Sequence, residues 1–389
     1  MGRGGVENMD AQKNVSIPFA EIYDKNINFL IGSGASYGIA PTLELKIKHA
    51  NGCPHTVETL GKHFEDQGKL DLMALLLMHY YVECIKPILL FDYEKAGLEQ
   101  KKVIESYKSF LRSISFLLNR KRANKQCNIF TSNYDNCFVQ AIESIYKETC
   151  FGFNLNDGAK GFGKKYLSAR NFNTIQYETS QFRQHKTEIP QVNLIHLHGS
   201  VFWKKEDELA ISVDYKNKLA DIDSENIMKS VVSEFSNIVS NDVARLEELE
   251  DCVQFSVDEN QFVEQYKKLP IVNPTKWKFH ETVFEEHYYQ MLRYMSYELE
   301  KENSVLIVFG FSFADEHILN IVKRSLSNPK LKIYICCFTE AEETVIRGRF
   351  SSSDQIEYIS LPDKKLCFEK FNQHVFNEKP KDLPEELSL

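Results

Sequence analysis

The sequence lacks several signals that mark common protein classes. No two of its nine cysteines form a C-x-x-C pair, which excludes an ordinary zinc ribbon. The N-terminal stretch has no apolar run of the kind found in a signal peptide. The most hydrophobic stretch, Leu72 to Leu90, is interrupted by His79, Glu83, Lys86 and Pro87, so it is expected to be a core helix. We therefore expect an ordered cytoplasmic protein that does not enter a membrane.

Charge is unevenly distributed along the 389 residues, although 43% apolar and 26% charged residues are typical of a soluble globule. The net charge is −8, but residues 221–266 carry twelve acidic and two basic side chains, which leaves +2 for the rest. This acidic segment disfavours direct binding of nucleic acid, because phosphate contacts need Lys and Arg. It could contact a basic protein surface, or it could be a solvated helical face.

Short apolar runs alternate with helical periodicity along the chain. The runs lie at 28–31, 127–131, 193–197, 304–309, 332–338 and 356–361, and helical spacing follows at 138–146, 281–301 and 315–325. This alternation predicts an α/β fold, a Rossmann-like, doubly wound parallel sheet covered by helices on both faces.

The pattern also suggests how the chain is divided. Residues 26–375 would form the core, with helical insertions at about 57–118 and 215–266, an N-terminal segment 1–25 and a polar tail 376–389. The stretch 151–180 lacks clear periodicity and is expected to be a long loop.

Four polar motifs each follow an apolar run. Alone, each is a common turn or helix cap, but ligands of parallel sheets bind at the carboxyl ends of strands. The motifs are Gly32-Ser33-Gly34-Ala35-Ser36, Thr131-Ser132-Asn133-Tyr134-Asp135, His198-Gly199-Ser200 and Gly310-Phe311-Ser312-Phe313-Ala314-Asp315.

Together and in this order, the motifs resemble the cofactor site of the sirtuin superfamily. The chain looks most similar to bacterial sirtuin-like proteins of anti-phage defence, several of which are NADases and some of which assemble with a HerA-type ATPase. The resemblance implies that NAD is the substrate, that Asn133 and His198 are catalytic, and that no metal takes part. It also implies cofactor contacts from Gly32, Ser33, Gly34, Ala35, Ser36, Asp135, Gly310, Ser312 and Asp315.

These residue types suit cleavage of the bond between nicotinamide and ribose. Nicotinamide leaves as a neutral molecule, so the reaction needs an oriented attacking group and help with ribose hydroxyl protons rather than a strong acid. The carboxamide of Asn133 could hold a water or a hydroxyl, and His198 could act as a base near neutral pH. Both residues are expected to lie at exposed strand ends.

Gly32 and Gly34 would bring backbone amides to the pyrophosphate at the start of a helix. Asp315 could contact the cofactor or could equally cap the helix that follows it.

The chain departs from the pattern of sirtuin deacylases. It lacks their zinc-binding cysteines, its Gly-rich loop continues as YGIAPTLELK without their arginine, and Ser132 stands where they have glutamine. Water is then a better expected acceptor than acyl-lysine. An NAD or ADP-ribose sensor without catalysis, and an ADP-ribosyltransferase or deacylase, remain alternatives. A dehydrogenase is disfavoured because GSGAS lacks the third glycine of G-x-G-x-x-G.

Two further expectations concern metal and assembly. His196 and His198 form an H-x-H pair, but no third ligand stands at a suggestive spacing, so His196 is expected to be a wall residue rather than a metal ligand. An unrestrained NADase would exhaust its host, so we expect a homo-oligomer controlled by a partner such as the HerA-type ATPase.

Overall fold

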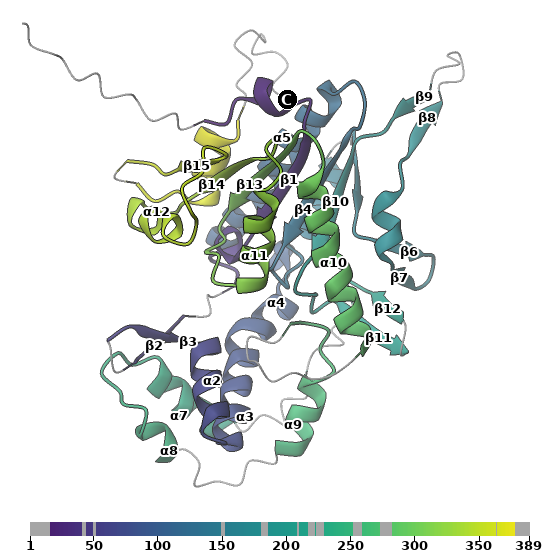
Figure 1. The fold of residues 1–389 in the computed structure, drawn as a ribbon. Helices are drawn as coiled ribbons and strands as arrows, with labels where there is room; N and C mark the ends of the chain where they lie inside the picture. The colour runs from purple at the N-terminus through teal and green to yellow at the C-terminus, as the bar shows by residue number, and fades with distance from the viewer. Residues whose placement is uncertain are drawn as a thin grey trace, which may run out of the picture.

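Seven parallel strands form the central sheet of the protein (Figure 1). The computed structural model describes residues 16–40, 44–49, 52–148, 152–179, 186–207, 210–216, 222, 229–251, 259–272, 282–362 and 364–377. The sheet has the order β15-β14-β13-β1-β4-β10-β5, and every neighbouring pair is parallel. Its strands are β1 (Asn26–Ile31), β4 (Gln126–Thr131), β5 (Asn154–Asn156), β10 (Gln191–His196), β13 (Ser304–Phe309), β14 (Lys332–Cys336) and β15 (Ile356–Ile359).

The strand order is that of a Rossmann sheet. If the short edge strand β5 is set aside, the chain enters β1 in the middle, runs outward through β4 and β10, and then returns to β13, β14 and β15 on the other side of β1. This is the doubly wound order 3-2-1-4-5-6, whose switch point lies between β1 and β13. The predicted fold class is confirmed.

Helices cover both faces of the sheet, and the central strands are therefore buried on both sides. One face packs against α5 (Leu98–Arg120), α6 (Cys137–Glu148), α13 (Phe368–Lys370) and the π-helical turn η6 (Phe371–Val375). The other face packs against α10 (Thr282–Glu300), α11 (Glu316–Ser325) and α12 (Glu340–Arg347). Helix α5 therefore belongs to the layer that covers the sheet, although it falls within the first predicted insertion.

A second group of helices lies beyond the carboxyl ends of the strands and has a hydrophobic core of its own (Figure 1). It contains the hairpin of β2 (Glu44–Lys48) and β3 (Pro54–Thr56), and the helical elements α2 (Val57–Asp66), α3 (Leu70–Tyr80), η2 (Tyr81–Ile85), α4 (Lys86–Leu90), α7 (Lys229–Val239), α8 (Glu248–Asp251) and α9 (Glu259–Tyr266). Segments from both predicted insertions thus meet in one unit, whose core also takes in Val201 and Ile271 next to the sheet. The domain boundaries given above remain predictions.

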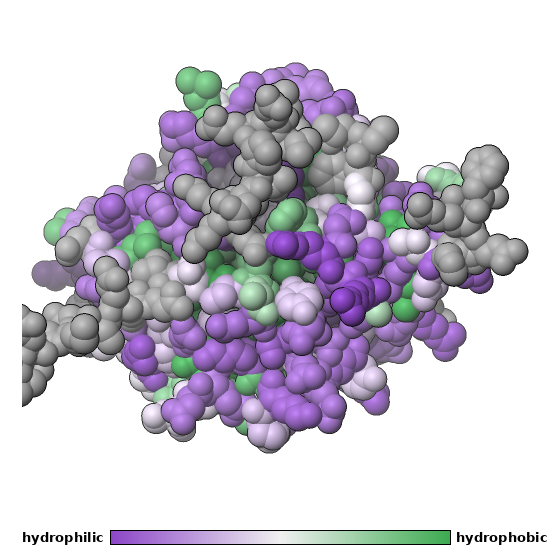
Figure 2. All heavy atoms as spheres, turned by 90° about the horizontal axis from the view of Figure 1, so that it is seen from above, coloured by the Kyte–Doolittle hydropathy of each residue, from purple (hydrophilic) through white to green (hydrophobic). Residues whose placement is uncertain are grey.

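The continuous helical stretch Leu70–Leu90 is long and apolar enough to cross a membrane, with a mean hydropathy of 1.4, but 78% of it is buried inside the protein. The prediction of a core helix is therefore confirmed. The stretch contains a π-helical turn at Tyr81–Ile85 just before Pro87. Pro87 has no N–H and would clash with the preceding turn, and the wider π turn accommodates it. Hydrophilic residues dominate the surface shown in Figure 2.

The expectation of a loop over 151–180 is wrong for its described part. That part contains β5, β6 (Ala159–Gly161), β7 (Lys165–Leu167), the 3-10 helix η4 (Ala169–Asn173) and β8 (Tyr177–Thr179). Strands β6 and β7 join β11 (Trp203–Asp207) and β12 (Ala210–Val213) in a small antiparallel sheet, and β8 pairs with β9 (Lys186–Glu188). These strands are three to five residues long, too short for apolar alternation to stand out. Two further short elements are α1 (Phe19–Ile22) and the 3-10 helix η3 (Tyr93–Lys95).

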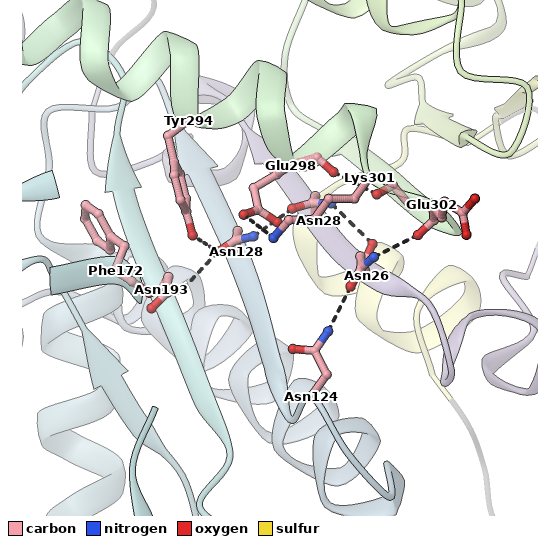
Figure 3. A network of polar contacts seen from close by, with 11 residues as sticks. Asn26, Asn28, Asn124, Asn128, Phe172, Asn193, Tyr294, Glu298, Lys301 and Glu302 are labelled. Carbon is pink, nitrogen blue, oxygen red and sulfur yellow. Dashed lines mark hydrogen bonds and ion pairs between the residues drawn. The ribbon is translucent and has the colours of Figure 1, made fainter. Parts of the chain in front are cut away.

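A row of buried asparagines crosses the sheet inside the core (Figure 3). Asn28, Asn128 and Asn193 stand in register on β1, β4 and β10. The Asn128 amide donates to the Asn28 carboxamide oxygen at 2.9 Å, and the Asn193 amide donates to the Asn128 carboxamide oxygen at 2.9 Å. Tyr294 of α10 also donates to Asn128, at 3.4 Å. Because buried amides are costly to leave unpaired, this row fixes the register of three strands and therefore the level at which they end.

Candidate functional site

The four predicted motifs come together at one edge of the sheet. Ile31 is in register with both Thr131 and Phe309, and Thr131 is in register with His196, so the strands end at the same level. The segments that follow them must therefore be neighbours at the carboxyl edge, next to the switch point. The predicted convergence of the motifs is confirmed.

The Gly-rich loop packs backbone against backbone on the loop that begins at Gly310. The amide of Gly34 donates to the Gly310 carbonyl at 3.0 Å. A Cβ on Gly32 would lie 2.3 Å from the Gly310 oxygen, and Gly310 itself has φ +66. Glycine is required at Gly32 by this close approach and at Gly310 by its left-handed backbone as well.

This geometry corrects the expected phosphate loop. The turn is followed by a four-residue 3-10 helix, η1 (Ser33–Ser36), rather than by an α-helix. The amides of Gly32, Gly34 and Ala35 are already donated within the protein. The pattern did not reveal this, because the glycines serve the contact with Gly310, which is distant in sequence. Ser33 and Ser312 are both exposed on the two loops, and the cofactor contacts assigned to this region remain predictions.

Asn133 is fixed through its side-chain nitrogen. Its Nδ2 donates to the Gly32 carbonyl at 3.2 Å and to Ser36 Oγ at 3.0 Å. The Gly32 carbonyl can only accept, so the amide nitrogen must face it and the carboxamide oxygen must point elsewhere. Asn133 is only 8% exposed and the His198 side chain is 14% exposed, so the expectation that both lie at exposed strand ends is wrong.

Ser36 and Asp135 bond to each other. Ser36 Oγ donates to Asp135 Oδ2 at 2.6 Å, so the hydroxyl of Tyr107, 2.7 Å from Ser36, must donate to it. Asp135 Oδ1 also accepts the amide of Cys137 at the start of α6. Ser36 and Asp135 are buried. Ser36 accepts from the Asn133 amide and is itself held by its bond to Asp135. Their predicted contacts with the cofactor remain predictions.

His198 lies against Asp315, which comes from a different motif. His198 Nε2 is 2.9 Å from Asp315 Oδ2, although the pair is not aligned as a hydrogen bond. Burial raises the pKa of Asp315, but the contact with His198 outweighs it and holds that pKa below its ordinary value. Nε2 is shut off from solvent by this contact, so Nδ1 is the nitrogen left to meet a ligand.

Asp315 has the capping role that the sequence offered and also faces His198, while its predicted contact with the cofactor remains a prediction. Its Oδ1 accepts the amide of Ile318 at 3.0 Å and so caps α11. Its other oxygen faces His198. One carboxylate therefore begins a helix and orients the predicted base.

Glu58 is a residue that the sequence reasoning missed. It lies in the first turn of α2, in the second group of helices. Glu58 is exposed as a residue, but partial burial of its carboxyl group raises its pKa, and the negative charge of Asp315 raises it further, whereas His198 lowers it. The helical unit thus brings a carboxyl group near the His198–Asp315 pair, which no motif indicated.

The segment after His198 is tied to the Asn133 motif. Ser200 Oγ donates to the Tyr134 carbonyl at 3.0 Å, and the Tyr134 hydroxyl donates to the Val272 carbonyl at 2.7 Å. The Val272 amide in turn donates to the His198 carbonyl at 2.8 Å. These bonds hold the two predicted catalytic segments together.

The described residues contain no group of three His, Cys, Asp or Glu side chains that could hold a metal ion. His196 bonds to the Asn133 carbonyl, whereas His198 faces Asp315, so the two histidines have different partners.

Residues 128–239 match the family model of the SIR2-like domain. This stretch is similar to sirtuin-like domains. It includes Asn133, Asp135 and His198, and the similarity is consistent with an enzyme that uses NAD. No curated protein matches the chain.

Proposed function

We propose that the protein is an NAD+ glycohydrolase. In the proposed reaction the bond between the nicotinamide nitrogen and ribose C1′ breaks, and the oxygen of a water molecule bonds to C1′. The products are nicotinamide, ADP-ribose and one proton.

The observation that carries the proposal is the orientation of Asn133. Both hydrogens of its amide are donated inside the protein, so its oxygen is available to accept from a water or a ribose hydroxyl. An oriented acceptor of this kind can place the attacking water without adding a titrating group.

The His198–Asp315 pair supplies the base of the proposed reaction. Asp315 faces Nε2, which favours the proton on that nitrogen and leaves the lone pair on Nδ1. Such a nitrogen can accept a proton from a ribose hydroxyl or from the water as positive charge develops on the sugar. The carboxylate would stabilise the imidazolium that forms.

The experiment is release of nicotinamide from NAD by the purified protein. We expect Asn133→Ala and His198→Ala to abolish it, while Asn119→Ala and His374→Ala, at exposed positions elsewhere, should match the parent protein. Asn133→Ala removes two buried hydrogen bonds and should cost about 1–3 kcal/mol of stability, so folding is checked by thermal melting. Full turnover by folded Asn133→Ala and His198→Ala would refute the assignment.

The sensor alternative predicts a different result. A sensor would bind NAD, as measured by calorimetry, without releasing nicotinamide. A transferase or deacylase would need an added acceptor.

The wider role is part of the proposal. Depletion of NAD in anti-phage defence, as a homo-oligomer controlled by a HerA-type ATPase, follows from the resemblance of the motifs. Assays with and without a genomically adjacent ATPase, together with light scattering, test it.

A further inference from the structure

Among the described residues, His196 makes one hydrogen bond, and it is with Asn133. It is the last residue of β10 and is 3% exposed. Its Nδ1 lies 2.9 Å from the backbone carbonyl oxygen of Asn133. A carbonyl can only accept, so the proton must be on Nδ1.

The remainder of the ring fixes its protonation state. Nε2 is buried and has no hydrogen-bond partner among the described residues. A proton on Nε2 would therefore be a buried donor without an acceptor, which is costly. Burial lowers the pKa of His196, and this outweighs the Asn133 carbonyl and the carboxylates of Asp135 and Asp157, which raise it. The ring is a neutral imidazole with one donor, aimed at Asn133.

Asn133 is thus held at three points. Its amide N–H donates to Thr131 Oγ1 at 3.1 Å, its side chain donates to Gly32 and Ser36, and its carbonyl accepts from His196. Neither of the first two points bonds to the peptide that follows Asn133. The bond from β10 restrains that peptide and joins it to the strand that leads to His198.

We propose that His196 is a positioning residue for Asn133: it holds the Asn133 peptide so that the carboxamide oxygen keeps its direction. The inference rests on the proposed function, since it assigns a kinetic role to the contact. It replaces the expectation that His196 is only a wall residue.

His287 of α10 provides a matched control. It is also a buried histidine with an unpartnered Nε2, and its ring packs edge-on against Trp203 at 5.3 Å, as the ring of His196 does at 5.8 Å. Within the described part of the chain, its ring forms no hydrogen bond with Asn133. Loss of either ring should disturb packing around Trp203, but only loss of His196 should affect Asn133.

The experiment compares His196→Leu, His196→Asn, His196→Gln and His287→Leu in full-length protein. Nicotinamide release gives kcat and KM, calorimetry gives NAD affinity, and thermal melting reports folding. The amide nitrogen of Asn occupies nearly the place of imidazole Nδ1, whereas that of Gln lies nearer the place of Nε2. His196→Asn should therefore restore the hydrogen-bond donor to the Asn133 carbonyl, whereas His196→Leu and His196→Gln should not.

We expect His196→Leu to lower kcat by about 100-fold, as small misplacement of a reacting group does, with NAD affinity unchanged. His196→Asn should restore most of kcat, and His287→Leu should leave it unchanged. If His196→Leu does not fold, the contrast between Asn and Gln decides. Equal kcat in all variants, or equal losses from His196→Leu and His287→Leu, would overturn the inference while the parent remains active. A parent protein that releases no nicotinamide would instead refute the proposed function and remove the basis of the inference.

Discussion

Replacing Asp315 separates its two contacts. Asp315→Asn keeps an oxygen for the Ile318 amide and so keeps the cap of α11, but it removes the charge that faces His198. Asp315→Ala removes both. The neighbouring exposed carboxylate Glu316 provides a control, Glu316→Gln, which should change neither stability nor activity.

The expected losses of stability and activity follow from these two contacts. Loss of the cap in Asp315→Ala should cost about 1 kcal/mol of stability, whereas Asp315→Asn should be close to the parent protein. Both should lower kcat/KM by roughly 10- to 100-fold, because the base loses its orienting carboxylate. Stability is measured by urea unfolding and activity by nicotinamide release.

The pKa of Asp315 sets the pH dependence. Its folded-state pKa lies below the ordinary 3.8, so the contribution of its charge is present above that value and is lost only as pH falls through the lower folded pKa. The Asp315 carboxylate should therefore stay ionised between about pH 5 and 8, so protonation of Asp315 itself should add no step to the pH profile of the parent protein in that range. Full activity in Asp315→Asn would show that the contact with His198 has no part in catalysis.

Three other predictions concern the scaffold. Gly32→Ala should destabilise the protein by about 1–3 kcal/mol, because its Cβ would lie 2.3 Å from the Gly310 oxygen, whereas Gly163→Ala, with nothing within 4 Å, should be neutral in urea unfolding. Asn128→Ala should cost about 2–5 kcal/mol, since it leaves amide groups of Asn28 and Asn193 unpaired, and a loss no greater than that of exposed Asn119→Ala would contradict a role for the row. Burial lowers the pKa values of His55, His79 and His287 to about 4, so the unfolded chain binds more protons below pH 6.5, the ordinary value, and stability should fall from there toward pH 4. Unfolding free energies that do not change over that range would show that these rings are not held neutral.

Much of the sheet could be predicted because its strands are short, mostly apolar runs. The runs at 28–31, 127–131, 193–197 and 304–309 correspond to β1, β4, β10 and β13, and the polar motif after each run lies at the shared carboxyl edge. A buried parallel sheet produces this pattern directly.

What escaped prediction depends on contacts between residues far apart in sequence. The glycine loop is shaped by Gly310, Asn133 is held by His196, and the position of Glu58 follows from how the second helical unit packs. The spacing of residues within a short stretch of sequence does not indicate these contacts. The short strands between 154 and 179 were missed because three residues are too few to show alternation.

The central claim is that water is the acceptor in NAD cleavage, and the mass of the product formed in ¹⁸O-labelled water tests it most directly. Hydrolysis predicts ADP-ribose that carries one ¹⁸O atom at C1′, formed in step with nicotinamide and absent with Asn133→Ala. Nicotinamide release that yields unlabelled cyclic ADP-ribose, or ADP-ribose attached to a protein or other acceptor, would contradict the account.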